Sequence, residues 1–281
     1  MFSDRLYRLA NAFYAIVGTG KKLEETDTVL ILGGSNGLGR ELCISLYNRK
    51  IRVINVDTIN FLPLHKYYSF IHCHDFADTS NVQNAMQDVK SLEFTITALI
   101  NNVQRDFETI YDEEDEKNTD DDSVDKMREC VSSNLTNVVI ATKYFLKEII
   151  PQTIRLSKGK LQEYYIVNLS TLLTLHVPER ASRYISSKAA LNQFHDSLTS
   201  ECRCSARRAK IKTLLVFLPY VKDLESWKYL RPYLSEQLVQ CMQDGRQGDV
   251  LLRIDNTPLT ACKISDAATC RLSNMLPKWK Q

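Results

Sequence analysis

The feature that most constrains the fold is a regular alternation, starting near residue 28, of short apolar segments with longer segments of helical periodicity. Segments that alternate in this way form βαβ units, which build a parallel sheet covered by helices. The apolar segments are almost continuous in hydrophobicity, as is typical of strands that are buried on both faces. We therefore predict an α/β fold of three layers around a doubly wound parallel sheet, with strands at residues 28–32, 52–56, 69–72, 97–100, 164–169, 212–218 and 249–253.

Helical periodicity completes this pattern between the predicted strands. Helices are expected at residues 37–49, 80–90, about 122–147 and about 182–206. The chain has 281 residues, of which 44% are apolar, and this is enough to bury one large core. We predict a single domain at residues 28–253, preceded by an N-terminal extension at 1–27 and followed by a C-terminal tail at 254–281.

Charge and cysteine content exclude several classes of function. The 36 basic and 34 acidic side chains leave a net charge of +2, so no strong electrostatic field attracts nucleic acid. The eight cysteines include no C-x-x-C pair and no histidine at zinc-finger spacing, so no metal site is expected. Scattered cysteines in apolar segments behave as small hydrophobic residues in a reducing compartment, which indicates a cytoplasmic protein.

The N-terminal extension has the periodicity of an amphipathic helix. Apolar residues recur at spacings of three and four between residues 2 and 17. The longest uncharged stretch, residues 9–20, has twelve residues, against about 20 needed to span a bilayer. Two interpretations stay open: the helix docks on its own domain, or it lies on a membrane surface such as that of the endoplasmic reticulum or a lipid droplet.

A glycine-rich loop follows the first predicted strand directly and leads into a helix. Its pattern is G-x-x-x-G-x-G, formed by Gly33, Gly37 and Gly39. Glycines of this kind let backbone amides approach a pyrophosphate, whose charge is stabilised by the helix N-terminus. The alternative is a turn that closes a βα unit and binds no ligand. The position between a strand and a helix favours a dinucleotide site, whose contacts would come from Gly33, Ser35, Asn36, Gly37, Leu38 and Gly39.

The second predicted strand leads to an acidic residue, Asp57, eighteen residues after Gly39. A carboxylate at this place accepts hydrogen bonds from both hydroxyls of an adenosine ribose and repels a 2′-phosphate. Positions 36 and 58 carry no arginine or lysine that would neutralise such a phosphate. The cofactor predicted from these residues is NAD, and NADP is less favoured.

A phenol and an ammonium group are placed on one helix face by Tyr184 and Lys188, which are four residues apart. A lysine close to a phenol favours the phenolate, so Lys188 is expected to lower the pKa of Tyr184 from about 10. Tyr184 would then serve as proton donor and acceptor. A Y-x-x-x-K match alone is common, and its weight comes from its place in the order of motifs.

Taken together, these motifs resemble the short-chain dehydrogenase/reductase family from about residue 28 to residue 218, in the family's order. The resemblance implies a Rossmann fold and reversible hydride transfer between a nicotinamide cofactor and an alcohol or carbonyl carbon. Under it, Tyr184 is the acid/base, Lys188 holds the nicotinamide ribose, and Asn134 positions a water in a proton relay. The substrate oxygen is oriented by Thr171, thirteen residues before Tyr184, or by Ser170 if the loop is shifted by one residue.

The resemblance also implies cofactor contacts after the later strands. Asp75 matches the family's adenine-contacting aspartate, and Asn101 matches the first asparagine of its Asn-Asn-Ala-Gly segment. Neighbouring contacts would come from Phe76 and from Val221, in the loop after the sixth strand.

The segment after the sixth strand usually covers the substrate in this family. Here Trp227, Leu230 and Leu234 could line an apolar cavity, or they could simply pack in the core. The first alternative, together with the amphipathic N-terminus, implies a hydrophobic secondary alcohol or ketone, or a lipid-like alcohol or aldehyde, as substrate. The family tends to pair through its two long helices, which implies a homodimer through residues 122–147 and 182–206.

Departures from the family pattern gather around the nicotinamide half of the site. Val103 and Gln104 replace Ala-Gly, Thr174 replaces a glycine, and Tyr220 replaces another after the sixth strand. These replacements keep a second interpretation open, a catalytically weakened regulatory protein that binds the dinucleotide. An epimerase or dehydratase is a third, but few residues remain for the extended substrate domain of such enzymes. The retained tyrosine and lysine favour the oxidoreductase.

Overall fold

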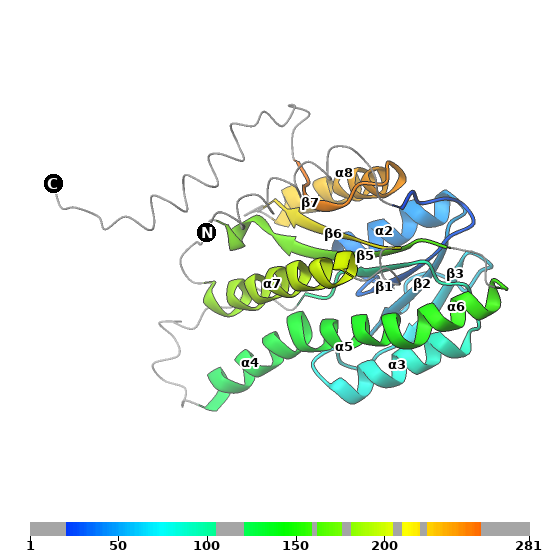
Figure 1. Cartoon of the computed structure of the whole chain (residues 1–281). Helices are drawn as coiled ribbons and strands as arrows, with labels where there is room; N and C mark the ends of the chain where they lie inside the picture. Colours follow the sequence, from blue (N-terminus) through cyan, green and yellow to red (C-terminus); the bar gives the residue numbers. More distant parts are fainter. Residues whose placement is uncertain are drawn as a thin grey trace.

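Seven parallel strands form the centre of the molecule (Figure 1). The computed structural model describes residues 21–104, 121–158, 162–175, 181–204, 210–219 and 224–253. Within them the strand order is β3-β2-β1-β4-β5-β6-β7, and every neighbouring pair is parallel. The order reverses between β1 and β4, so the chain builds each half of the sheet outward from this point. The predicted doubly wound parallel sheet, a Rossmann fold, is confirmed.

The strands lie within two residues of the apolar segments that predicted them. The largest extension is at the end of β5, which continues through Thr171 because its residues pair with β6 as far as Leu218. The strand bounds are β1 Thr28–Leu32, β2 Arg52–Asp57, β3 Tyr68–His72, β4 Ala98–Asn101, β5 Tyr164–Thr171, β6 Ile211–Leu218 and β7 Gly248–Leu251.

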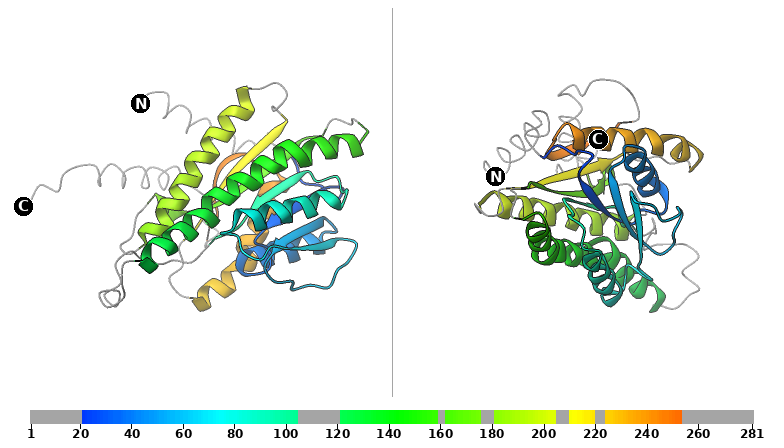
Figure 2. Two further views of the ribbon diagram at one scale, coloured as in Figure 1. Left: turned by 90° about the horizontal axis from the view of Figure 1, so that it is seen from below. Right: turned by 90° about the vertical axis from the view of Figure 1, so that its right-hand side faces the viewer.

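Helices cover both faces of the sheet. On one face lie α2 (Gly37–Asn48) and α8 (Leu224–Gln243), and on the other lie α3 (Thr79–Ser91), α7 (Ser182–Cys204) and a long helical run (Figure 1). Figure 2 shows α7 beside this run, which comprises α4 (Asp121–Val131), α5 (Asn137–Tyr144) and α6 (Ile150–Leu156).

The long helical run differs from its predicted end at about residue 147. Two π-helical turns, Ser132–Thr136 and Phe145–Ile149, join α4 to α5 and α5 to α6. Pro151 does not end the run. It lies two residues after the second π-helical turn, where the regular α-helical hydrogen-bond pattern is already interrupted. The first π turn places Asn134 in a widened stretch of helix, a geometry that is frequent at functional sites.

Two apolar clusters fill the space between the sheet and its helices. One lies toward α2 and α8, and the other lies toward α3, α5 and α7. Leu234 is fully buried in the first cluster, and Trp227 and Leu230 pack against it. The structure therefore supports the packing alternative for these three residues rather than the lining of a substrate cavity.

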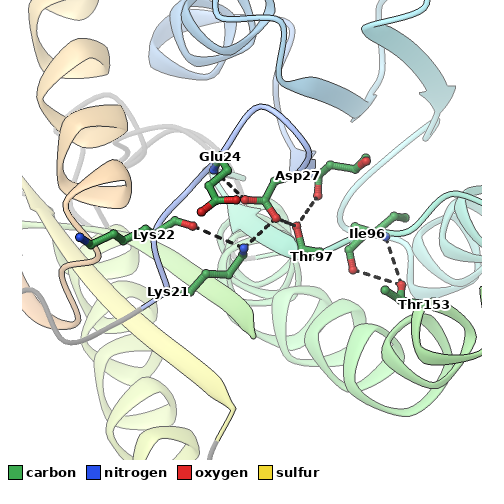
Figure 3. Close-up of polar contacts among 8 residues, drawn as sticks. Lys21, Lys22, Glu24, Asp27, Ile96, Thr97 and Thr153 are labelled. Atoms are coloured by element: carbon green, nitrogen blue, oxygen red, sulfur yellow. Dashed lines mark hydrogen bonds and ion pairs between the residues drawn. The ribbon is translucent and has the colours of Figure 1, made fainter. Parts of the chain in front are cut away.

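A buried ion pair fixes the segment before β1 (Figure 3). The Lys21 Nζ lies 2.7 Å from the Asp27 Oδ1, and the two side chains are 11% and 6% exposed. The Asp27 carboxylate also accepts hydrogen bonds from the Thr97 hydroxyl at 2.6 Å and the Glu24 amide at 2.8 Å. Asp27 thus ties the chain before β1 to the residue that precedes β4.

Several predictions concern residues outside the described ranges. The amphipathic helix at residues 2–17 and the tail at 254–281 both lie there, so they stay predictions. No helix in the described part of the chain is both long and apolar enough to cross a membrane. The six cysteines in that part are free thiols.

We expect Asp27→Ala to lower the free energy of unfolding by about 3 kcal/mol, because it leaves the Lys21 ammonium buried without its counter-ion. Chemical denaturation checks this value. The control is Glu148→Ala, which removes the ion pair of Glu148 with Lys90. Their side chains are 46% and 36% exposed, so this variant should cost far less stability than Asp27→Ala. Equal costs for the two variants would contradict the role given to the buried pair.

Candidate active site

The glycine-rich loop crosses the carboxyl ends of β1 and β2 and is held there by hydrogen bonds. The Gly33 amide donates to the Val56 carbonyl at 2.9 Å, and the Gly34 amide donates to the Asn55 Oδ1 at 3.0 Å. Gly33 and Gly37 have φ angles of +82° and +55°, a backbone conformation that strongly favours glycine. A Cβ on Gly39 would lie 2.1 Å from the Gly33 carbonyl oxygen, so only glycine fits.

Open space adjoins this loop at Gly37. A Cβ built on Gly37 meets no atom within 4 Å, and the neighbouring Asn36 is exposed. Gly37 also begins α2, and the first N–H groups of a helix have no partner within the helix. These amides and the positive end of the helix dipole suit a phosphate group, so the loop fits a dinucleotide. Ser35 and the Leu38 side chain are buried and support the loop from inside.

The carboxylate of Asp57 borders the same loop. Its Oδ2 accepts a hydrogen bond from the Ser35 amide at 2.6 Å, and its Oδ1 accepts one from the Thr58 amide at 2.7 Å. The side chain of Ser35 is fixed in turn, since its hydroxyl accepts a hydrogen bond from the Asn55 Nδ2 at 2.9 Å. The acid predicted to meet the adenosine ribose therefore lies beside the loop predicted to hold the phosphates.

Asp75 and Phe76 follow β3 at the same edge of the sheet. The Asp75 Oδ1 accepts the Ala77 amide at 2.9 Å, and the Phe76 carbonyl accepts a hydrogen bond from the Asn137 Nδ2 at 2.7 Å. Both residues are half-buried, so contact with an adenine ring stays a prediction for them. Val221 lies outside the described residues.

Asn101 lies deeper in the fold than expected of a residue that contacts the cofactor. It is 1% exposed, and its Nδ2 donates to the Asn168 Oδ1 at 2.7 Å and to the Thr142 hydroxyl at 3.1 Å. The Asn168 Nδ2 lies 2.9 Å from the Nδ1 of His195, whose pKa burial lowers to about 3. Asn101 therefore belongs to a neutral buried network that joins β4, β5 and α7. Its neighbour Asn102 reaches the glycine loop instead, since its Nδ2 donates to the Gly33 carbonyl.

Tyr184 and Lys188 lie one turn apart near the N-terminal end of α7, at the carboxyl ends of β4 and β5. The Lys188 Nζ is 6.0 Å from the centre of the Tyr184 ring. It donates hydrogen bonds to the carbonyls of Val103 at 3.2 Å and Leu169 at 3.1 Å. The Tyr184 hydroxyl donates to the Gln104 Oε1 at 3.2 Å. The structure thus brings the predicted phenol and ammonium together at the edge of the sheet that carries the glycine loop.

The two groups have pKa values set mainly by burial. Burial raises the pKa of Tyr184 above its ordinary value of 10, and the nearby Cys130 adds to this effect. Burial also lowers the pKa of Lys188 to about 8. The Tyr184 pKa therefore shifts upward rather than toward neutrality, and burial is the largest cause of this shift.

Asn134 links the helical run to α7 beside this pair. Its Nδ2 donates to the Ser187 hydroxyl at 3.0 Å and approaches the Cys130 sulfur at 3.4 Å. The Ser187 hydroxyl donates to the Tyr184 backbone carbonyl at 2.7 Å. The expected relay asparagine is thus fully buried next to the tyrosine and lysine, and its role with a water molecule stays a prediction.

Thr171 and Ser170 end β5 close to the same site. The Thr171 Oγ1 accepts the Leu173 amide at 3.3 Å, and this bond leaves the hydroxyl proton available to a substrate oxygen. Ser170 is 1% exposed, and its buried hydroxyl has no hydrogen-bond partner among the described residues. Thr171 remains the first prediction for the residue that orients the substrate oxygen, and Ser170 remains the second.

Sequence reasoning missed three contributors to this site. Cys130 and Ser187 hold Asn134, and the backbone carbonyl of Leu169 helps to hold the Lys188 ammonium. The spacing of four residues between Cys130 and Asn134 on one predicted helix could have indicated the first contact. The contacts of Ser187 and Leu169 join segments that are distant in the sequence, so no local pattern predicts them.

Comparison with known proteins agrees with this fold. Residues 27–222 match the family model described as short chain dehydrogenase. The chain is 39% identical over 259 residues to the oxidoreductase-like protein SRL4 of Saccharomyces cerevisiae, and the match covers 88% of this chain and 92% of SRL4.

Solved structures share the fold. A short chain dehydrogenase from Burkholderia cenocepacia in complex with NADP has a TM-score of 0.63 at 14% identity, covering 90% of this chain and 97% of that one. A short chain dehydrogenase from Leptospira borgpetersenii with bound NAD⁺ has a TM-score of 0.60 at 19% identity, covering 83% and 92%.

The fold and site define an α/β protein of the dinucleotide-binding oxidoreductase class. The chain belongs to the short-chain dehydrogenase family.

We expect the buried Lys188 to make stability rise with pH. Its pKa falls from 10.5 in the unfolded chain to about 8 in the folded protein. Below pH 8 both states hold the proton, and the cost of burying the ammonium is fully present. Between pH 8 and 10.5 the folded state releases the proton first, which relieves that cost. Unfolding at about pH 7.5 and about pH 9.5 should show the parent gaining about 2 kcal/mol more than Lys188→Met.

Other groups titrate alike in both proteins, so the difference isolates Lys188. The same pH dependence in parent and variant would contradict a buried ammonium at this position.

Proposed function

We propose that the protein is an NAD-dependent oxidoreductase that transfers hydride between the nicotinamide and a hydrophobic alcohol or carbonyl compound. The observation that carries the proposal is the buried pair of Tyr184 and Lys188 at the edge of the sheet where the glycine loop borders open space. A bound nicotinamide supplies the hydride chemistry, and the protein supplies position and proton transfer. The solved relatives named above carry NADP or NAD⁺, which supports a nicotinamide cofactor.

Each residue of the pair has a distinct part in this proposal. Tyr184 holds its proton at neutral pH because burial raises its pKa, so it is ready to donate to a carbonyl oxygen. Thr171 donates a second hydrogen bond to the same oxygen and orients it. Lys188 is mostly charged below pH 8, and with Asn134 it returns a proton to the phenol from solvent.

The choice of NAD over NADP rests on Asp57. Its carboxylate lies within hydrogen-bond distance of the Ser35 amide, beside the loop that would hold the pyrophosphate. A ribose seated there meets an acceptor for its hydroxyls, whereas a 2′-phosphate meets a negative charge. The neighbouring Thr58 offers no cation to compensate.

Other parts of the proposal concern the surroundings of the site. Family resemblance supports a homodimer through the long helical run and α7, and the sequence pattern supports membrane-surface contact through residues 2–17. A regulatory protein that binds the dinucleotide without turnover is the second candidate, favoured by the contact of Gln104 with the Tyr184 hydroxyl.

Titration of the purified chain with NADH and NADPH, followed by assays on a panel of ketones, aldehydes and secondary alcohols, tests the proposal. We expect tighter binding of NADH than of NADPH, and turnover of at least one hydrophobic carbonyl compound. Binding without any turnover would favour the regulatory protein, and a folded chain that binds neither nucleotide would contradict both.

The matched control is Asp57→Ser, which keeps a hydrogen-bonding side chain but removes the charge. We expect this variant to bind NADH more weakly. The ratio of the two dissociation constants should shift about tenfold in favour of NADPH, which is the effect of one charge-assisted contact. An unchanged ratio would contradict the role of Asp57.

A further inference from the structure

The hydroxyl of Tyr184 already has an acceptor in this chain, and it is a carbonyl oxygen. The hydroxyl donates to the side-chain Oε1 of Gln104 at 3.2 Å. Gln104 follows Val103, whose backbone carbonyl accepts from the Lys188 ammonium at 3.2 Å. The Gln104 carboxamide therefore contacts the Tyr184 hydroxyl, and the peptide group before Gln104 is held by Lys188.

The geometry points to Gln104 as a residue that competes with the substrate, because its carboxamide oxygen occupies the position of the substrate carbonyl oxygen. This inference rests on the proposed function, in which Tyr184 donates its proton to a carbonyl. An amide oxygen and a ketone oxygen accept the same O–H hydrogen bond with the same planar geometry. A substrate binds by exchanging its oxygen for that of Gln104, and small molecules that carry an unhindered carboxamide are ligands of the same position.

The exchange is physically easy for this side chain. Gln104 is exposed, whereas Tyr184 is 8% exposed and Lys188 is 1% exposed. A displaced glutamine regains rotamer freedom and hydrogen-bonds to water, while the phenol keeps one acceptor throughout. The cost of displacement falls on binding, so Gln104 raises KM for every carbonyl substrate and leaves kcat unchanged.

Two variants of Gln104 separate the effect of its hydrogen bond to Tyr184 from the effect of its bulk in the site. Gln104→Met keeps nearly the same length and bulk but offers only a weak acceptor. Gln104→Ala removes both the bulk and the acceptor. If the hydrogen bond matters, both variants bind carbonyl ligands more tightly. If only bulk matters, the methionine variant behaves like the parent and the alanine variant alone changes.

The test uses propanamide, whose carboxamide matches the end of the glutamine side chain. Its dissociation constant for the full chain, measured by ligand-detected NMR, needs no turnover. We expect it to fall about tenfold in both Gln104→Met and Gln104→Ala, the value for loss of one competing hydrogen bond. With a ketone substrate, KM should fall by a similar factor at constant kcat, and propanamide should inhibit competitively.

An unchanged dissociation constant in Gln104→Met, with NADH binding as in the parent, would overturn the inference. So would a change in kcat without a change in KM. If the parent shows no turnover at all, the proposed function fails, while the propanamide measurement still decides whether Gln104 occupies the position beside Tyr184. Tyr184→Phe is the last control, because it removes the hydroxyl for which Gln104 and propanamide compete. In the Tyr184→Phe background, replacing Gln104 by Met or Ala should leave the dissociation constant of propanamide unchanged.

Discussion

The charged end of Lys188 is the constraint on which the site depends. The side chain is 1% exposed, and its ammonium is held by the carbonyls of Val103, just after β4, and Leu169, near the carboxyl end of β5. A buried charge is costly unless hydrogen bonds satisfy it, so the lysine can lie only where the sheet edge offers free acceptors. Parallel strands offer such acceptors where they end. Fixing Lys188 there also fixes α7, and with it Tyr184 one turn earlier.

This constraint explains why departures from the family pattern leave the site assembled. Val103 binds the Lys188 ammonium through its backbone carbonyl, and this contact does not depend on the side chain at position 103. Gln104 contributes its carboxamide oxygen, which accepts a hydrogen bond from the Tyr184 hydroxyl. The sequence indicated that replacements at these two positions weaken the nicotinamide half. In the structure one of them supports the lysine, and the other places a competing carbonyl at the tyrosine.

The fold could be predicted from the sequence because the central strands β1, β4 and β5 are buried along their whole length and are therefore nearly continuous apolar runs. The glycine loop was equally predictable, since a positive φ at Gly37 and the close contact at Gly39 leave little alternative to glycine. The pKa of Tyr184 was not predictable, because it depends on how much protein surrounds the phenol rather than on the spacing to Lys188. Trp227 shows the same limit, since an aromatic side chain suits a cavity and a core equally well until its neighbours are known.

The most direct test of the account compares Tyr184→Phe with the parent on a carbonyl compound that the parent reduces. Loss of the phenolic proton donor should lower kcat by at least about 100-fold, while the dissociation constant for NADH stays within the error of the parent value. That pairing of results would mark the hydroxyl as the proton donor rather than a packing element. A variant that keeps most of its turnover with intact NADH binding would contradict the central claim that the buried tyrosine, held beside Lys188, carries the chemistry.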